Sequence, residues 1–224
     1  MYKTDYYGIH ENRYRKLKAE GASGWSSGID NQILLETIER TFKSEKINTS
    51  HRILDLGCGN GFLTISLAKV GYQITGIDIS TTAIQWAKEK AHEQNLDVDF
   101  VEGDVCNLPF PDNSFDVVID DRCLHCIIGD DRKLFLSNAN RVLKKGGLLT
   151  IMSMCNDPIE EPVLKFYDPE SRCMVVNGIA GRYFGLPEDI IAEVVKSDFK
   201  VRHWEIIPPT GEGQDDLYLV AEKP

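Results

Sequence analysis

Short apolar runs alternate with longer amphipathic stretches from about residue 52 onward. Runs rich in β-branched residues predict strands, whereas apolar residues that recur every three or four positions predict helices. The pattern predicts seven strands, at residues 52–56, 73–78, 98–101, 116–120, 148–154, 200–206 and 216–221. Strands that alternate with helices form βαβ units, so we expect a largely parallel sheet. The last two strands are joined by the turn-forming segment Pro208-Pro209-Thr210-Gly211 with no helix between them, which predicts an antiparallel pair.

Helices are predicted in the gaps between these strands. They follow Gly61 and Pro187, and they cover residues 81–94 and 131–145. The helix at residues 81–94 has Ser80 or Thr81 available as its N-cap. The helix at residues 131–145 is predicted to end in Lys144-Lys145-Gly146-Gly147, because basic side chains and glycine both suit a helix C-terminus.

Two regions fall outside this alternation. Helices predicted at residues 13–20 and 31–42 precede the first strand, and we expect residues 1–50 to form a helical cap or lid. The link at residues 155–185 is too long for a simple connection and carries several aromatic side chains. Long links in compact domains are often binding loops, so we expect an insertion on the substrate side.

Composition narrows the classes of function. The chain has 224 residues, a formal net charge of −10 and 42% hydrophobic residues, which is typical of one soluble α/β domain. An acidic chain without clustered lysine and arginine disfavours a nucleic-acid partner. Neither a membrane span nor a signal-peptide core is apparent. We therefore expect a cytoplasmic monomer or homodimer whose six cysteines are free thiols.

The segment Asp55-Leu56-Gly57-Cys58-Gly59-Asn60-Gly61 follows the first predicted strand and carries the strongest chemical signal. Glycines let the backbone bend sharply and approach a ligand closely, which indicates a nucleotide site. Dinucleotide enzymes prefer G-x-G-x-x-G, whose third glycine would fall on Phe62 here. The spacing therefore disfavours an NAD(P)-dependent oxidoreductase, which is kept as an alternative.

Four segments in order resemble the class I S-adenosylmethionine-dependent methyltransferases, in particular the group that acts on small molecules. They are the glycine-rich turn, Gly76-Ile77-Asp78-Ile79-Ser80, Glu102-Gly103-Asp104-Val105, and the strand at residues 114–120 with its successor after residue 141. The resemblance implies a Rossmann-like, doubly wound α/β fold over residues 51–224. It also implies the strand order 3-2-1-4-5-7-6, with the last strand antiparallel and helices on both faces.

The same resemblance implies that S-adenosyl-L-methionine is the cofactor. Asp78 would accept hydrogen bonds from both ribose hydroxyls. Asp104 would accept from the adenine amine while the Val105 amide donates to the ring. The implied cofactor-binding residues are Asp55, Gly57, Cys58, Gly59, Asn60, Gly61, Asp78, Ile79, Asp104, Val105 and Asp120.

The segment at residues 120–126, Asp-Asp-Arg-Cys-Leu-His-Cys, follows the fourth strand, where ligands bind in open α/β sheets. Methyl transfer mainly requires alignment, and a base is needed only when the nucleophile arrives protonated. Asp121 and His125 are the candidate catalytic residues for that proton. Structural roles stay open for both: an ion pair of Asp121 with Arg122 or Arg132, and a hydrogen bond of His125 within the turn.

Two metal hypotheses compete with a metal-free site. Asp120 or Asp121 together with Asn156-Asp157 could supply oxygen ligands for magnesium, as in catechol-type methyltransferases, although the acid–amide order is reversed here. Cys123, His125 and Cys126 could instead present a soft metalloid such as arsenite. Cysteines also serve as small buried apolar residues, and we predict no metal.

The leading hypothesis is an enzyme that transfers a methyl group from S-adenosylmethionine to an O, N or S nucleophile of a small molecule. Two motifs of nucleic-acid methylation, an Asn/Asp-Pro-Pro-aromatic segment after the fourth strand and a Pro-Cys nucleophile, are missing from the sequence. A partner protein that binds the cofactor without turnover is the alternative.

Overall fold

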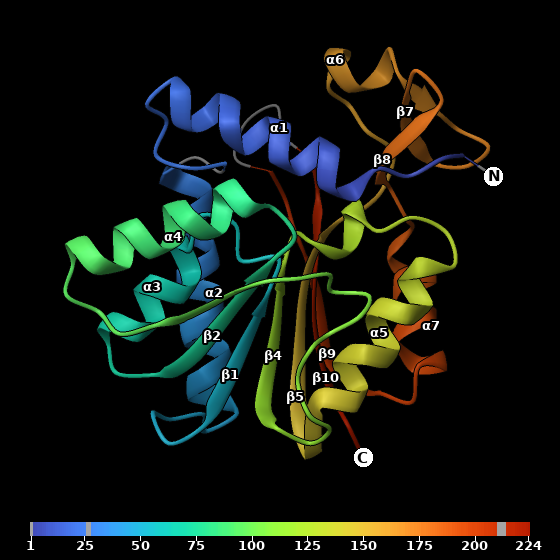
Figure 1. Ribbon diagram of the computed structural model, residues 1–224. Coiled ribbons are helices and arrows are strands. Elements are labelled where there is room, and N and C mark those ends of the chain that lie inside the picture. Colours follow the sequence, from blue (N-terminus) through green and yellow to red (C-terminus); the bar gives the residue numbers. More distant parts are fainter. Residues whose placement is uncertain (1, 26–27, 210–213) are drawn as a thin grey trace.

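The computed structural model describes residues 2–25, 28–209 and 214–224 (Figure 1). Its central sheet has the order β3-β2-β1-β4-β5-β10-β9. These strands are β1 (Arg52–Leu56), β2 (Gln73–Asp78), β3 (Asp99–Glu102), β4 (Phe115–Asp121), β5 (Leu143–Met154), β9 (Lys200–Ile207) and β10 (Asp216–Glu222). β10 runs antiparallel to both β5 and β9, which confirms the predicted order and the predicted hairpin. Thr210 and Gly211 of the predicted turn lie outside the described residues.

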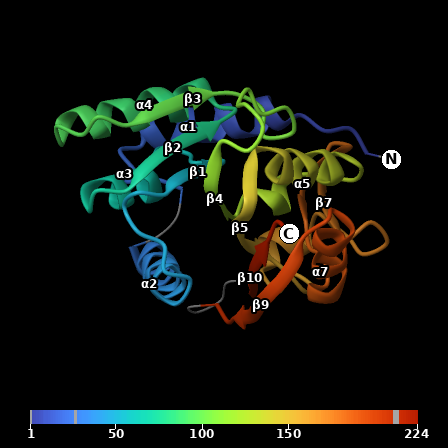
Figure 2. The same ribbon diagram turned by 90° about the horizontal axis from the view of Figure 1, so that it is seen from below.

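Helices cover both faces of this sheet (Figure 2). They are α1 (Tyr6–Ala19), α2 (Gly28–Ser44), α3 (Phe62–Lys69), α4 (Thr81–Glu93), α5 (Asp131–Val142) and α7 (Pro187–Lys196). Side chains alternate between the faces of a strand, so Ile53 packs with α2 and α3 while Leu54 and Leu56 pack with α5 and α7. The doubly wound α/β architecture is confirmed, and Ser80 caps α4 by accepting from the Ala83 amide (3.1 Å).

The predicted end of the helix at residues 131–145, in the segment Lys144-Lys145-Gly146-Gly147, is wrong. α5 ends at Val142, and β5 begins at Leu143, whose φ of −69° and ψ of 140° are extended. Leu143 pairs with Phe115 on β4, and Lys144 donates to Asp116 of the same strand (2.8 Å). Pairing with a neighbouring strand thus outweighs the local basic and glycine signal.

The link at residues 155–185 has structure of its own. It contains α6 (Glu161–Leu164) and an antiparallel sheet of β6 (Tyr167–Asp168), β7 (Cys173–Val176) and β8 (Ile179–Tyr183). The segment that precedes α1 lies beside this sheet, since the Ala180 amide donates to the Lys3 carbonyl (2.9 Å). The insertion and the N-terminal helix therefore meet above the same edge of the central sheet (Figure 1).

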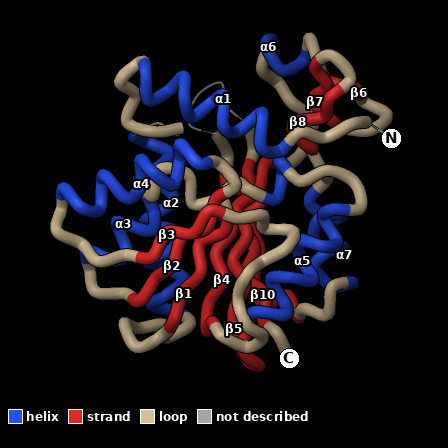
Figure 3. Tube along the Cα trace, in the orientation of Figure 1, coloured by secondary structure: helices blue, strands red, loops and turns tan. Residues whose placement is uncertain are grey.

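The carboxyl ends of the parallel strands all point toward α1, which lies across that edge (Figure 3). Asp5 is the N-cap of α1, and its carboxylate accepts a hydrogen bond from the Gly8 amide (2.9 Å). No helix in the described parts of the chain is both long enough and apolar enough to cross a bilayer.

Candidate functional site

A cavity of about 720 Å³ lies between α1 and the carboxyl edge of the sheet. This volume falls within the range of small-molecule sites. Its walls come from the turn after β1, the ends of β2 and β4, the segment after β3, the start of β10 and the N-terminal region. Parallel strands bring these segments together because their carboxyl ends share one edge.

The glycine-rich turn has the backbone geometry that its sequence predicts. Gly57, Gly59 and Gly61 have φ values of +68°, +54° and +80°, a region that disfavours side chains. A β-carbon on Gly59 would also overlap the Tyr14 hydroxyl on α1. Asp78 holds the turn, since its Oδ2 accepts from the Gly59 amide (2.9 Å). The turn therefore depends on glycine for both its bend and its contact with α1.

Asp78 lies at the end of β2 and is buried in the cavity wall. Its Oδ1 accepts from the Ser80 amide (2.8 Å), so two backbone donors fix the carboxylate plane. Each carboxylate oxygen has two acceptor sites, which leaves capacity for a ligand diol. Asp104 is oriented in the same way, because its Oδ1 accepts from the Cys106 amide (2.8 Å).

The cavity brings together nine of the eleven predicted cofactor-binding residues: Asp55, Gly57, Cys58, Gly59, Asn60, Asp78, Ile79, Asp104 and Val105. Gly61 and Asp120 are not part of its lining. Gly61 instead packs against Ala87 and Phe100, where a β-carbon would lie about 3 Å from each. Asp120 Oδ1 accepts from the Cys123 and Leu124 amides (2.8 and 3.0 Å) and so shapes the turn after β4.

Asp55, Asp120 and Asp121 lie in or next to the cavity wall and have raised pKa values, chiefly because burial penalises the ionised form. The pKa of Asp55 rises to about 7, although Thr64 donates to it (2.5 Å). The pKa of Asp120 rises to about 8, and that of Asp121 rises to about 6. Asp55 and Asp121 both line the cavity, and Asp121 has the lower pKa of the two.

The ion pair that was left open for Asp121 forms with Arg122, at a distance of 4.0 Å. Arg122 also pairs with Asp216 on β10, at the shorter distance of 2.6 Å. Arg132 pairs with Glu193 on α7 (2.6 Å). Asp121 Oδ1 is buried and has no hydrogen-bond partner among the described residues.

His125 lies in the short 3-10 helix η1 (Leu124–Cys126) and lines the cavity. It is 4% exposed, and its Nδ1 has no hydrogen-bond partner in the described structure, so a turn-stabilising bond at Nδ1 is not found. Burial, and then the positive charge of Arg182, lowers the pKa of His125 well below its usual value. The imidazole is therefore neutral at pH 7.

Glu11 on α1 lies outside the cavity lining, but it positions α1 over the site and was missed by the sequence analysis. It is almost fully buried and accepts hydrogen bonds from Ser80 Oγ (2.8 Å) and from the Thr82 amide (3.0 Å), at the N-terminus of α4. A carboxylate at a helix N-terminus is favoured by the helix dipole. One signal in the sequence indicates that Glu11 is buried: it lies three residues before Tyr14, on the same helix face as Tyr14 and Leu17.

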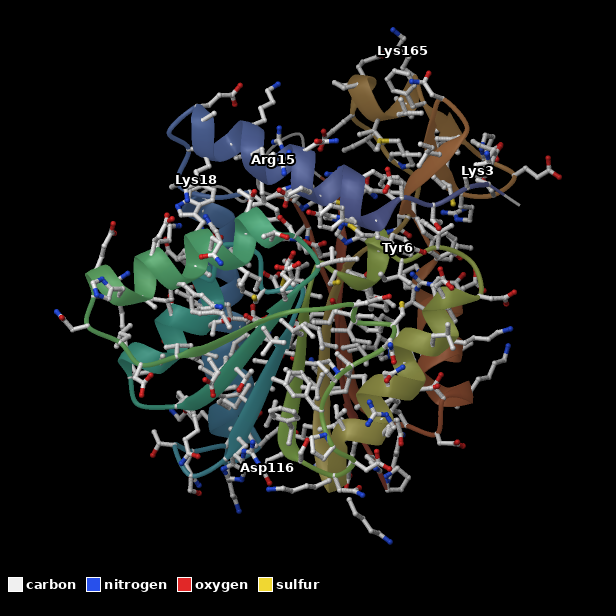
Figure 4. All side chains as sticks on the ribbon, in the orientation of Figure 1. Lys3, Tyr6, Arg15, Lys18, Asp116 and Lys165 are labelled. Atoms are coloured by element: carbon white, nitrogen blue, oxygen red, sulfur yellow. The ribbon has the colours of Figure 1, made fainter. Side chains whose placement is uncertain are left out.

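Aromatic side chains complete the roof of the cavity. Trp25 contacts Tyr14 edge-on and His10 at a tilt, with ring centroids 5.3 and 5.6 Å apart. Tyr6 lies where α1 meets the segment after β4, whereas Asp116 lies at the opposite edge of the sheet (Figure 4). The Tyr6 hydroxyl donates to Asp131 (2.9 Å) and accepts from the Ile128 amide (3.1 Å). α1 is thus fastened to α4 at one point and to α5 at another.

The magnesium hypothesis finds no support in the placement of its ligands. Asn156 donates to Asp215 (2.8 Å), and Asp157 pairs with Arg172 (3.1 Å), so both side chains are engaged away from Asp121. Within residues 2–25, 28–209 and 214–224, no group of three His, Cys, Asp or Glu side chains is placed to hold a metal ion. Cys126 is buried and Cys123 is partly buried, and desolvation raises the pKa of each thiol.

A family described as a methyltransferase domain matches residues 54–151, which run from β1 into β5. Residues 54–151 of this chain therefore resemble a methyltransferase domain. A solved S-adenosylmethionine-dependent methyltransferase of Methanosarcina mazei superposes with a TM-score of 0.69 at 22% identity, covering 81% of this chain and 96% of that one. That likeness shows the shared fold.

Several curated relatives of this chain carry names from quinone biosynthesis. A demethylmenaquinone methyltransferase of Staphylococcus haemolyticus is 35% identical over 134 residues, which cover 58% of this chain and 55% of the relative. A ubiquinone/menaquinone biosynthesis C-methyltransferase of Vibrio cholerae is 33% identical over 154 residues, 64% of this chain and 58% of the relative. The matches thus span little more than half the length of these relatives.

Proposed function

We propose that this chain binds S-adenosylmethionine in the cavity beneath α1 and transfers its methyl group to a small molecule. The observation that carries the proposal is the gathering of the glycine turn, Asp78 and the Asp104-Val105 pair around one cavity. The family match over residues 54–151 and the names of the relatives support the same activity.

Each of these groups has a role toward the cofactor. Asp78 accepts from the ribose hydroxyls while its carboxylate is held by two backbone amides. Asp104 accepts from the adenine amine beside the apolar Val105 side chain. The glycine turn lets the backbone approach the methionine part, where a β-carbon would intrude. Asn60 donates to the Ser23 carbonyl (2.9 Å) and so ties this turn to the N-terminal cap.

Bound S-adenosylmethionine would supply an electrophilic methyl group on a positively charged sulfur, and S-adenosylhomocysteine would be left after the transfer. The chain aligns the two reactants and excludes water with α1 and Trp25. A proton released by the acceptor passes to Asp121, because a carboxyl with a pKa of about 6 is ionised at neutral pH. His125 is a much weaker base and contacts the acceptor as a neutral group.

Residues 1–50 act as the lid in this proposal, and residues 155–185 act as the acceptor-side insertion. Both regions contribute to the cavity wall, through Trp25 and Arg182 respectively. The relatives' names add a carbon nucleophile to the O, N and S acceptors that the sequence suggests.

Calorimetry with S-adenosylhomocysteine, S-adenosylmethionine and NAD tests the cofactor assignment. We expect heat of binding with the first two and none with NAD. Asp78→Asn should weaken binding about 10- to 100-fold, the effect of losing a hydrogen bond to a charged group. The matched control is Asp99→Asn, an exposed aspartate at the start of β3. Binding of NAD alone, or equal affinity of the two variants, contradicts the proposal.

Turnover is tested separately, by release of S-adenosylhomocysteine across phenols, amines, thiols, carboxylates and hydroquinones. Methyl transfer to at least one class is expected. Cofactor binding without turnover of any class supports the alternative of a non-catalytic binding partner.

A further inference from the structure

Arg182 differs from the other partly buried arginines of the described chain. Arg122, Arg132, Arg141 and Arg172 each pair with a carboxylate, at distances of 2.6 to 3.1 Å. Arg182 is also partly buried, yet it forms neither an ion pair nor a hydrogen bond with any described residue. Removing a guanidinium from water is costly unless an anion compensates. The described residues therefore do not supply the anion that would compensate the charge of Arg182.

Arg182 lines the cavity, and the fold holds it there. It lies on β8, which packs against η1. The next residue, Tyr183, stacks on the guanidinium of Arg132, 4.6 Å from the ring centre. Arg132 also donates to the Leu124 carbonyl of η1 (2.7 Å) and so joins η1 to β8. Neighbouring side chains on a strand point to opposite faces. Tyr183 points toward Arg132, and Arg182 therefore points to the other face, where it lines the cavity.

Three carboxylates of the same cavity, those of Asp121, Glu160 and Asp216, form no ion pair with Arg182. Asp216 is paired with Arg122, and Asp121 has Arg122 as its nearest cation. Glu160, on the insertion, is exposed and forms no ion pair with Arg182. His125 also lines the cavity and feels the charge of Arg182, and its buried Nδ1 has no hydrogen-bond partner among the described residues. Two polar side chains of the acceptor side thus face the cavity with capacity for a ligand.

We propose that Arg182 binds a carboxylate group of the methyl acceptor, with His125 as a neutral second contact. A guanidinium presents two parallel N–H donors that match the two oxygens of a carboxylate. Aromatic and apolar cavity residues, among them Tyr6, Trp25 and Ile207, suit the body of such a molecule. The acceptor class is then a small carboxylate with an apolar or aromatic body. This inference rests on the proposed methyltransferase function and assigns its specificity to the insertion.

The test uses the full chain saturated with S-adenosylhomocysteine, with benzoate as the probe and benzamide as its uncharged match. Calorimetry should give saturable benzoate binding to the wild type and at least about tenfold weaker benzamide binding. Arg182→Gln should weaken benzoate binding about tenfold or more and leave benzamide unchanged, while Arg182→Lys recovers part of the affinity. Arg202→Gln is the matched control, because Arg202 lies on β9 outside the cavity lining.

The affinity for S-adenosylhomocysteine is measured first in every variant, and it separates two failures. If the wild type does not bind it, the proposed function itself is wrong. If the wild type binds it but Arg182→Gln does not, Arg182 serves the cofactor and the acceptor role is wrong. Equal binding of benzoate and benzamide, no benzoate binding, or unchanged benzoate binding in Arg182→Gln also overturns the assignment.

Discussion

Glu11 fastens the N-terminal helix α1 to the N-terminus of α4. Its side chain is 5% exposed and accepts from Ser80 Oγ (2.8 Å), from the Thr82 amide and hydroxyl (3.0 and 2.7 Å), and from Arg15 Nε (2.7 Å). Burial by itself would raise the pKa of Glu11, but the hydrogen bonds from Thr82, Ser80 and Arg15 outweigh it. The pKa falls from 4.5 to about 2. The ionised carboxylate is therefore the form that holds α1.

Glu11→Gln preserves the shape of the side chain but replaces one acceptor oxygen by an NH₂ group that faces other donors. A fall in pKa from 4.5 to about 2 corresponds to about 3 kcal/mol of stabilisation at neutral pH. We expect the variant to lose about 2–3 kcal/mol of unfolding free energy. The difference from wild type should be full above about pH 4.5 and shrink toward pH 2, because the wild-type carboxyl becomes protonated in that window.

Urea unfolding at several pH values measures this loss, and amide hydrogen exchange locates it on α1. The control is Glu20→Gln, which alters an exposed glutamate at the other end of the same helix, 3.8 Å from Lys16. We expect faster exchange along α1 and weaker binding of S-adenosylhomocysteine in Glu11→Gln alone. Two variants with equal stability and equal exchange would refute the role of Glu11 as the fastening of the lid.

Three further predictions concern the cavity floor and its turn. Gly59→Ala should cost at least about 1–2 kcal/mol from its left-handed backbone alone, and denaturant unfolding should show partial recovery when Tyr14→Phe is added. The wild type should lose stability below about pH 6.5, because the imidazole of His125 is neutral in the folded state and takes up a proton on unfolding. His125→Gln should reduce this loss by up to about 1.4 kcal/mol per pH unit. A melting temperature with the same pH dependence in both proteins argues against this role of His125. Thr64→Val should destabilise by about 1–3 kcal/mol, because Asp55 loses its hydroxyl donor, and an unaltered urea midpoint speaks against that bond.

Periodicity predicted the strands and most helices because both depend on short-range spacing. It failed at the start of β5, where Leu143 pairs with Phe115, which lies 28 residues earlier in the chain. It also assigned no elements to the insertion, whose β7 and β8 are short and pair with each other rather than with the central sheet. In both places a pairing partner, and not the local sequence, decided the conformation.

The sequence by itself determined the cofactor side of the site. Gly57, Gly59 and Gly61 carry their own signal, since positive φ is a property of single residues, and Asp78 and Asp104 follow strands that the pattern predicts. Only the tertiary structure decided the rest: that Glu11 reaches Ser80 across 69 residues, that the pKa of Asp121 is raised and that of His125 lowered, and that Arg182 faces the cavity without a partner among the described residues. Burial and charge–charge distance set these properties, and neither is encoded by neighbours in the chain.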